Sequence, residues 1–180
     1  MRNWHSLCAR HLKAMVLRRL GRTAEALQWI EESLRIDTFN YGCSWEKYLL
    51  TGNEADRNEL VGLMRRGAPD YETLVLDYAS AGAWDEALGV SRTALDRNVE
   101  ESTLLRYYAT WCLLRLGRTD EAREAGEAAE QAPAGCCFPN ALEAIEALQA
   151  VTTFLGKAPK AAYYLGNLWY DKRQYAEAVA

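Results

Sequence analysis

One six-residue pattern occurs four times in this chain of 180 residues and constrains its fold more than any other feature. The copies read Gly-Arg-Thr-Ala-Glu-Ala from Gly21, Gly-Ala-Trp-Asp-Glu-Ala from Gly82, Gly-Arg-Thr-Asp-Glu-Ala from Gly117 and Arg-Gln-Tyr-Ala-Glu-Ala from Arg173. Each copy follows one apolar pattern with helical spacing and precedes another. We call it the turn box, because it predicts the turn of a helix hairpin that recurs along the chain.

Each position of the turn box has a physical role. A Gly after the last apolar turn of a helix adopts the left-handed backbone conformation that ends the helix. Thr23 and Thr119 are expected to cap the second helix with their side-chain oxygens, and the Glu that follows lies at the positive end of the helix dipole. The closing Ala allows the second helix to lie close to the first. Arg173 lacks the freedom of Gly, so the fourth turn is expected to cost free energy.

These turns predict an all-α fold, an α-α superhelix in which antiparallel helix hairpins form a solenoid with irregular spacing. The steps between boxes are 35 residues from Gly82 to Gly117, but 61 and 56 residues on either side. Only the middle step approaches the ~34 residues of a two-helix repeat. We expect hairpins at about 3–36, 42–66, 70–97 and 101–131, an extra helix at 139–155 and a partial repeat at 160–180.

Local signals set the expected boundaries of the irregular elements. The segment Gly67 to Pro69 is expected to close the shortened hairpin at 42–66. Pro139 is expected in the first turn of the extra helix. The residues of that helix expected to face inward are Leu142, Ile145, Leu148 and Thr152.

We expect residues 1–180 to form a single repeat domain that is a fragment of a longer protein. Ala180 stops only a few residues into a predicted helix, which leaves that end of the array without a polar cap. Self-association through this uncapped end is therefore expected.

Composition and motifs exclude several classes of function. The net charge of −4 is small and both signs are dispersed, which argues against a nucleic-acid partner. No stretch approaches the roughly 18 apolar residues that would span a membrane. The five cysteines lack the spacing of a metal site or disulfide framework. We therefore predict a cytoplasmic protein that has reduced thiols, no metal, no cofactor and no enzymatic activity, since no catalytic motif is visible.

The fourth copy carries a resemblance to a known family. Tyr164-Leu165-Gly166-Asn167-Leu168-Trp169-Tyr170, followed by Tyr175 and Glu177-Ala178, resembles the first part of a tetratricopeptide repeat. The chain is also similar to the repeat region of large bacterial proteins of this kind that carry an amino-terminal β-rich domain of unknown function. In those proteins a Cys-Phe-Pro loop and a long helix precede a Tyr-Tyr-Leu-Gly-Asn repeat, as Cys137 to Pro139 and Tyr163 to Asn167 do here.

The resemblance implies that the first helix of each hairpin lines a concave ligand groove. In the third and fourth copies the groove positions are rich in aromatic side chains, which offer a large contact area at low entropic cost. The candidate ligand-binding residues are Tyr107, Trp111, Arg115, Tyr163, Asn167 and Tyr170. The alternative is that these aromatic residues belong to the core, because the extra helix at 139–155 lies between the two hairpins.

Two functions follow from this interpretation. The first is a non-catalytic scaffold that binds a protein or an extended peptide along the concave face of the solenoid. The second is a structural segment that positions another part of a larger bacterial enzyme, with carbohydrates as the substrate class suggested by the β-rich domain of the similar proteins.

Overall fold

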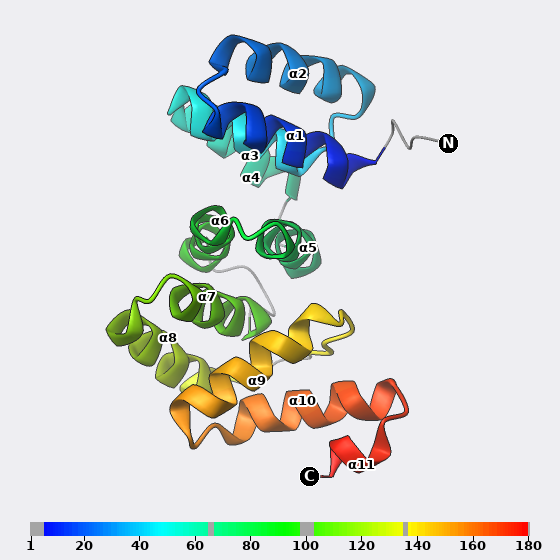
Figure 1. Ribbon diagram of the computed structural model, residues 1–180, viewed down its shortest axis with the longest axis vertical. Helices are drawn as coiled ribbons and strands as arrows, with labels where there is room; N and C mark the ends of the chain where they lie inside the picture. The colour runs from blue at the N-terminus through cyan, green and yellow to red at the C-terminus, as the bar shows by residue number, and fades with distance from the viewer. Residues whose placement is uncertain (1–5, 65–66, 98–102, 135–136, 180) are drawn as a thin grey trace. The chain divides into compact units, whose positions relative to one another are not determined.

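The computed structural model describes residues 6–64, 67–97, 103–134 and 137–179, and within these ranges the chain is an all-α helical repeat without a β-strand (Figure 1). The helices are α1 (Leu7–Arg19), α2 (Thr23–Ile36), α3 (Tyr41–Thr51), α4 (Glu54–Met64), α5 (Ala68–Ser80), α6 (Trp84–Asp96), α7 (Thr103–Arg115), α8 (Thr119–Gln131), α9 (Glu143–Leu155), α10 (Pro159–Asp171) and α11 (Tyr175–Ala178). No helix in the described part of the chain combines the length and the apolar character that crossing a membrane requires.

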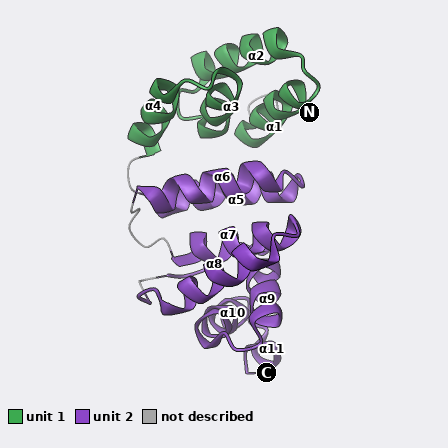
Figure 2. Ribbon diagram, turned by 90° about the vertical axis from the view of Figure 1, so that its left-hand side faces the viewer, with its two compact units in different colours: residues 1–65 green, residues 66–180 purple. Residues whose placement is uncertain are grey.

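The helices fall into two compact units, residues 1–65 with α1 to α4 and residues 66–180 with α5 to α11 (Figure 2). We call them unit 1 and unit 2 and describe each by itself. The helix pairs agree with the expected hairpins to within a few residues. The expected boundaries at residues 3, 66, 101 and 180 lie outside the described residues, and the single-domain organisation stays a prediction.

The four turn boxes share one hydrogen-bonded geometry. In the first, the N–H of Gly21 donates to the carbonyl of Arg18 and the N–H of Arg22 to that of Leu17, both at 2.9 Å. This pair of bonds is the Schellman motif, which requires a left-handed residue at the position of Gly21. The same bonds recur in the other three boxes. The first residue of the box has φ of 70°, 69°, 72° and 60° in chain order. The predicted helix-ending role of the box is confirmed.

The second helix of each hairpin begins without a threonine cap. Arg22 and Arg118 occupy the N-cap positions and make no capping bond with their side chains, so Thr23 and Thr119 are already the first helical residues. The expected threonine caps are wrong, because the residue that completes the Schellman motif is also the N-cap of the next helix. Its carbonyl accepts a bond from the closing Ala of the box.

Ion pairs replace the expected caps in the first and third boxes. The guanidinium of Arg22 lies 2.7 Å from Glu25, measured from Nε to Oε1, and the same atoms of Arg118 and Glu121 lie 2.6 Å apart. These hydrogen bonds lower the pKa of both carboxyl groups. Each glutamate also stands in the first turn of its helix, where a negative charge is favourable.

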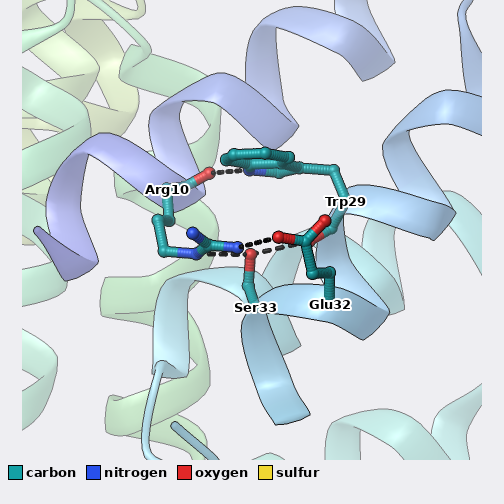
Figure 3. A network of polar contacts seen from close by, with 4 residues as sticks. All are labelled: Arg10, Trp29, Glu32 and Ser33. Atoms are coloured by element: carbon teal, nitrogen blue, oxygen red, sulfur yellow. Dashed lines mark hydrogen bonds and ion pairs between the residues drawn. The ribbon is translucent and has the colours of Figure 1, made fainter. Parts of the chain in front are cut away.

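Unit 1 is held together by arginines of α1. The Nε of Arg10 donates to the hydroxyl of Ser33 at 2.9 Å, and its Nη2 lies 3.4 Å from Glu32 (Figure 3). The indole N–H of Trp29 donates back to the carbonyl of Arg10 at 2.9 Å, so α1 and α2 are bonded in both directions. On α3, the buried carboxylate of Glu46 accepts from Arg18 at 2.6 Å. These bonds fix α1 against both of its neighbours.

Unit 2 stacks the α5–α6 and α7–α8 hairpins, and α9 packs between α7 and α10 (Figure 1). Two expected boundaries are wrong. Ala68 and Pro69 begin α5 instead of closing the preceding hairpin, because Pro is favourable in a first helical turn. The extra helix begins at Glu143 instead of residue 139, and Ala141 and Leu142 form the turn before it.

The buried face of α9 also differs from the expected one. It consists of Ala144, Ala147, Leu148 and Val151, whereas Leu142 is exposed. Alanines form this face because α9 lies close to the helices on either side, and their small side chains permit that approach. Of the four residues expected to face inward, Leu148 is buried, Ile145 and Thr152 are partly buried and Leu142 is exposed, so the expected face was only partly right.

Candidate functional site

Tyr107 joins three helices of unit 2. Its ring is fully buried, and its hydroxyl donates to the carboxylate of Glu130 on α8 at 2.7 Å. The same carboxylate accepts from the backbone N–H groups of Lys160 and Ala161, both at 2.9 Å, and so caps the first turn of α10. Burial, followed by the bond to Glu130, raises the pKa of Tyr107. The hydroxyl therefore stays a donor to this carboxylate.

Trp111 lies in a second buried cluster. Its ring packs edge to face against Trp84 of α6, with centroids 5.0 Å apart. The guanidinium of Arg115 covers the same Trp84 ring at 4.7 Å, and its Nη1 lies 3.2 Å from Glu146 on α9. Trp84 is partly buried, and Arg115 and Glu146 are exposed, whereas Trp111 is buried. The core alternative therefore describes the position of Trp111, as it does that of Tyr107.

The other three candidate residues form one exposed face of α10. Tyr163 and Tyr170 have 63% and 67% of their surface exposed, and Asn167 between them is partly exposed. Their spacing of four and three residues places them on the same side of the helix, with the tyrosines about 10 Å apart along its axis. We call Tyr163, Asn167 and Tyr170 the α10 face.

Neighbouring side chains hold both ends of the α10 face. The ring of Tyr163 packs 5.7 Å from that of Tyr164, which is buried and meets Tyr107 edge to face at 6.1 Å. Burial raises the pKa of Tyr164. At the other end, the rings of Tyr170 and Tyr175 lie 5.3 Å apart. Each of the two exposed tyrosines therefore packs against a neighbouring aromatic ring.

A shallow hollow adjoins the start of α10. Its volume is about 370 Å³, and its lining includes Glu127, Gln131, Lys157 and Pro159. Pro159 precedes Tyr163 by one helical turn and lies on the same side of α10. The hollow therefore extends the α10 face at its amino-terminal end.

The structure separates the six candidates into three groups. Tyr107 belongs to the joint with Glu130, Trp111 and Arg115 to the cluster with Trp84, and the remaining three to the α10 face. Trp84 and Tyr175 were missed as site neighbours, although both stand in turn boxes. Glu130 had no sequence signal, because it is one of many glutamates on a helix that is polar along most of its length.

The chemistry of the α10 face suits contact and hydrogen bonding. Tyrosine rings supply apolar area with a polar tip, and the amide of Asn167 donates and accepts.

Among known proteins, one family model matches the part of the chain that contains the two regular hairpins. Residues 72–135, which run from α5 to α8, match the family model described as tetratricopeptide repeat. No curated protein matches the chain. A solved structure, described as "Functional Characterization of Pseudomonas Aeruginosa pilF", is 13% identical, covers 95% of this chain and 71% of its own, and superposes with a TM-score of 0.34.

Proposed function

We propose, from the tetratricopeptide-repeat match over residues 72–135, that this chain is a non-catalytic scaffold that binds an extended peptide segment of a protein on the α10 face. Repeats of this kind are generally protein-interaction modules. The observation that carries the choice of face is the exposure of Tyr163 and Tyr170 together with the burial of Tyr107 and Trp111. Arg115 remains a candidate for contacts outside the α10 face.

The spacing of the α10 face supports an extended ligand. A peptide in the extended polyproline II conformation advances about 3.1 Å per residue with three residues per turn, so its side chains at i and i+3 lie on one side about 9 Å apart, close to the roughly 10 Å between the two tyrosines. These two side chains would lie on the tyrosine rings. Asn167, midway between them, would bond to a peptide group of the ligand, as amide side chains do with extended backbones.

Support of the exposed rings favours a binding role over a purely structural one. A side chain that is already held by its neighbours loses little entropy when a ligand orders it, which increases affinity. Tyr163 rests beside the buried Tyr164, and Tyr170 beside Tyr175. The cap from Glu130 fixes the start of the same helix.

A peptide selection with matched variants tests the proposal. Peptides selected by phage display on the intact chain are synthesised, and their affinity is measured by fluorescence anisotropy. Tyr163→Ser plus Tyr170→Ser is expected to weaken binding at least about tenfold, since it removes two aromatic contacts. Phe39→Ser is the control, because Phe39 is also aromatic and 59% exposed but belongs to unit 1.

The outcomes separate binding from folding. All three replaced side chains are exposed, so the helical signal in circular dichroism should stay unchanged. Asn167→Ala should weaken binding less than the double tyrosine variant does. Unchanged affinity of the double variant, or an equal loss in Phe39→Ser, would refute the α10 face as the binding site.

A further inference from the structure

Helix α1 in unit 1 presents an apolar stripe that the described residues leave partly or largely exposed. Ala9, Leu12, Val16 and the C-cap residue Leu20 lie within about 80° of one another around the axis of α1, given 100° per residue. Val16 and Leu20 are 47% and 64% exposed, although both are large apolar residues. We call Leu12, Val16 and Leu20 the α1 stripe.

The α1 stripe is part of a fixed surface. The opposite side of α1 is bonded to α2 through Arg10 (Figure 3). It is bonded to α3 through Arg18. Ala14 and Leu17 on that side are buried. Because these bonds define the rotation of α1, the stripe needs no rearrangement to receive a partner.

Positive charge borders the stripe on both sides. Lys13 and Arg19 are exposed and follow the two edges of the stripe around the helix. Leu7–Arg19 contains no acidic residue. The ammonium of Lys13 lies 3.3 Å from the centre of the Trp29 ring of α2. Glu25 of α2, a carboxylate that the charge of Lys13 affects, is bonded to Arg22. An apolar ridge with a cation on each side is complementary to an apolar ridge with an anion on each side.

We propose that the α1 stripe docks an acidic amphipathic helix of a partner protein. Leu12, Val16 and Leu20 form an i, i+4, i+8 ridge, which packs into the groove of a facing helix. Glutamates or aspartates beside the apolar residues of that helix would face Lys13 and Arg19. This surface lies on unit 1, so the inference goes beyond the proposed function of the α10 face on unit 2.

Two other occupants of the α1 stripe, a second copy of the chain and a membrane surface, fit it less well. A second copy placed stripe to stripe would bring Lys13 and Arg19 near their own equivalents, and like charges repel. A membrane surface would attract the charges, but interfacial helices insert a broad apolar face, often with Trp or Phe, about 5–10 Å into the lipid. The α1 stripe is narrow and aliphatic, and the rest of α1 is occupied by α2 and α3.

Two synthetic helical peptides test the proposal on the intact chain. Both carry leucines at i, i+4 and i+7, and one has glutamates along the edges of the leucine face where the other has lysines. The glutamate peptide is expected to bind at least about tenfold more tightly in fluorescence anisotropy, and added salt should weaken it. Equal affinity for the two peptides, or no measurable affinity for either, would overturn the proposal.

Variants locate the binding. Val16→Ser plus Leu20→Ser should weaken the glutamate peptide at least about tenfold, because two apolar contacts are lost. Leu142→Ser is the matched control, since Leu142 is 65% exposed but lies in unit 2. Lys13→Gln plus Arg19→Gln should abolish the preference between the peptides while retaining weak binding of both.

Two further measurements address the other occupants. Vesicles of phosphatidylcholine with phosphatidylserine should not retain the chain in flotation. Sedimentation should give the same molecular mass for the wild type and for Val16→Ser plus Leu20→Ser. Vesicle binding or self-association that disappears in this variant would replace the helix partner by a membrane or a second copy.

Discussion

The shared geometry of the turn boxes predicts opposite effects for two kinds of Gly→Ala change. Gly117 has φ of 72°, and a Cβ built there meets no atom within 4 Å. Gly117→Ala therefore adds no collision, and its whole cost is conformational. A left-handed residue with a Cβ costs about 1–2 kcal/mol, and Ala regains about 0.4–1 kcal/mol by restricting the unfolded chain. We expect a net loss of about 0.5–1 kcal/mol in the free energy of unfolding.

Gly62 supplies the control with the opposite sign. It lies inside α4, its surroundings are also open, and its φ is not in the left-handed region. Gly62→Ala should stabilise the chain by up to about 1 kcal/mol through helix propensity. Urea denaturation followed by circular dichroism measures both variants. If Gly117→Ala also stabilised the chain, the left-handed requirement of the turn box would be refuted.

Arg173 allows the same reasoning to be tested in reverse. Among the described residues it is the only non-glycine with positive φ, at 60°. Arg173→Gly should strengthen the turn between α10 and α11 by about 1 kcal/mol. Because α11 has four residues, the gain is read most directly as slower hydrogen exchange of the Gln174 amide, which bonds to the carbonyl of Trp169. Faster exchange would contradict the argument.

Three further predictions concern packing and charge. Glu130→Ala should destabilise the chain by about 2 kcal/mol and Tyr107→Phe by about 1 kcal/mol, and the double variant should lose less than the sum in urea denaturation, because one shared bond is counted twice. Gly42→Ala should cost about 1–3 kcal/mol by overpacking, since a Cβ there overlaps the imidazole of His11; an unchanged thermal midpoint would show that the site relaxes. Hydrogen bonds from Arg118 and Arg92 lower the pKa of Glu121. The ionised carboxylate therefore stabilises the folded chain above the ordinary glutamate pKa, and this stabilisation disappears as the pH falls through the lowered pKa. Glu121→Gln should flatten this part of the stability–pH profile.

Much of the fold was predictable because it depends on local chemistry. The turn box combines a helix-ending Gly with a small Ala five residues later, so both requirements act within six residues. The buried Ala26, Ala87 and Ala122 confirm the close approach that the box predicts. The narrower resemblance to bacterial proteins with a β-rich domain stays a prediction.

The errors arise where packing between distant segments decides. The resemblance to tetratricopeptide repeats placed Tyr107 and Trp111 at groove positions, but both are buried, as the core alternative expected. Helices from elsewhere in the chain cover them, and a repeat pattern within one hairpin cannot detect that cover. Gly126, a buried residue of α8, shows the same effect of distant segments. A Cβ there would lie 3.1 Å from a methyl of Leu155 at the end of α9. The end of the extra helix thus accounts for the glycine at this position.

The double use of one residue in each turn box restricts where the chain can gain or lose length. Arg118, for example, completes the end of α7 with its N–H and begins α8 with its carbonyl, so the turn contains no spare residue. An insertion inside the box would break one of these bonds, whereas a whole helix added between hairpins leaves both intact. The irregular steps of this chain have that form: α3 and α4 in one, α9 in the other. Length variation in such an array is therefore expected to come in units of helices.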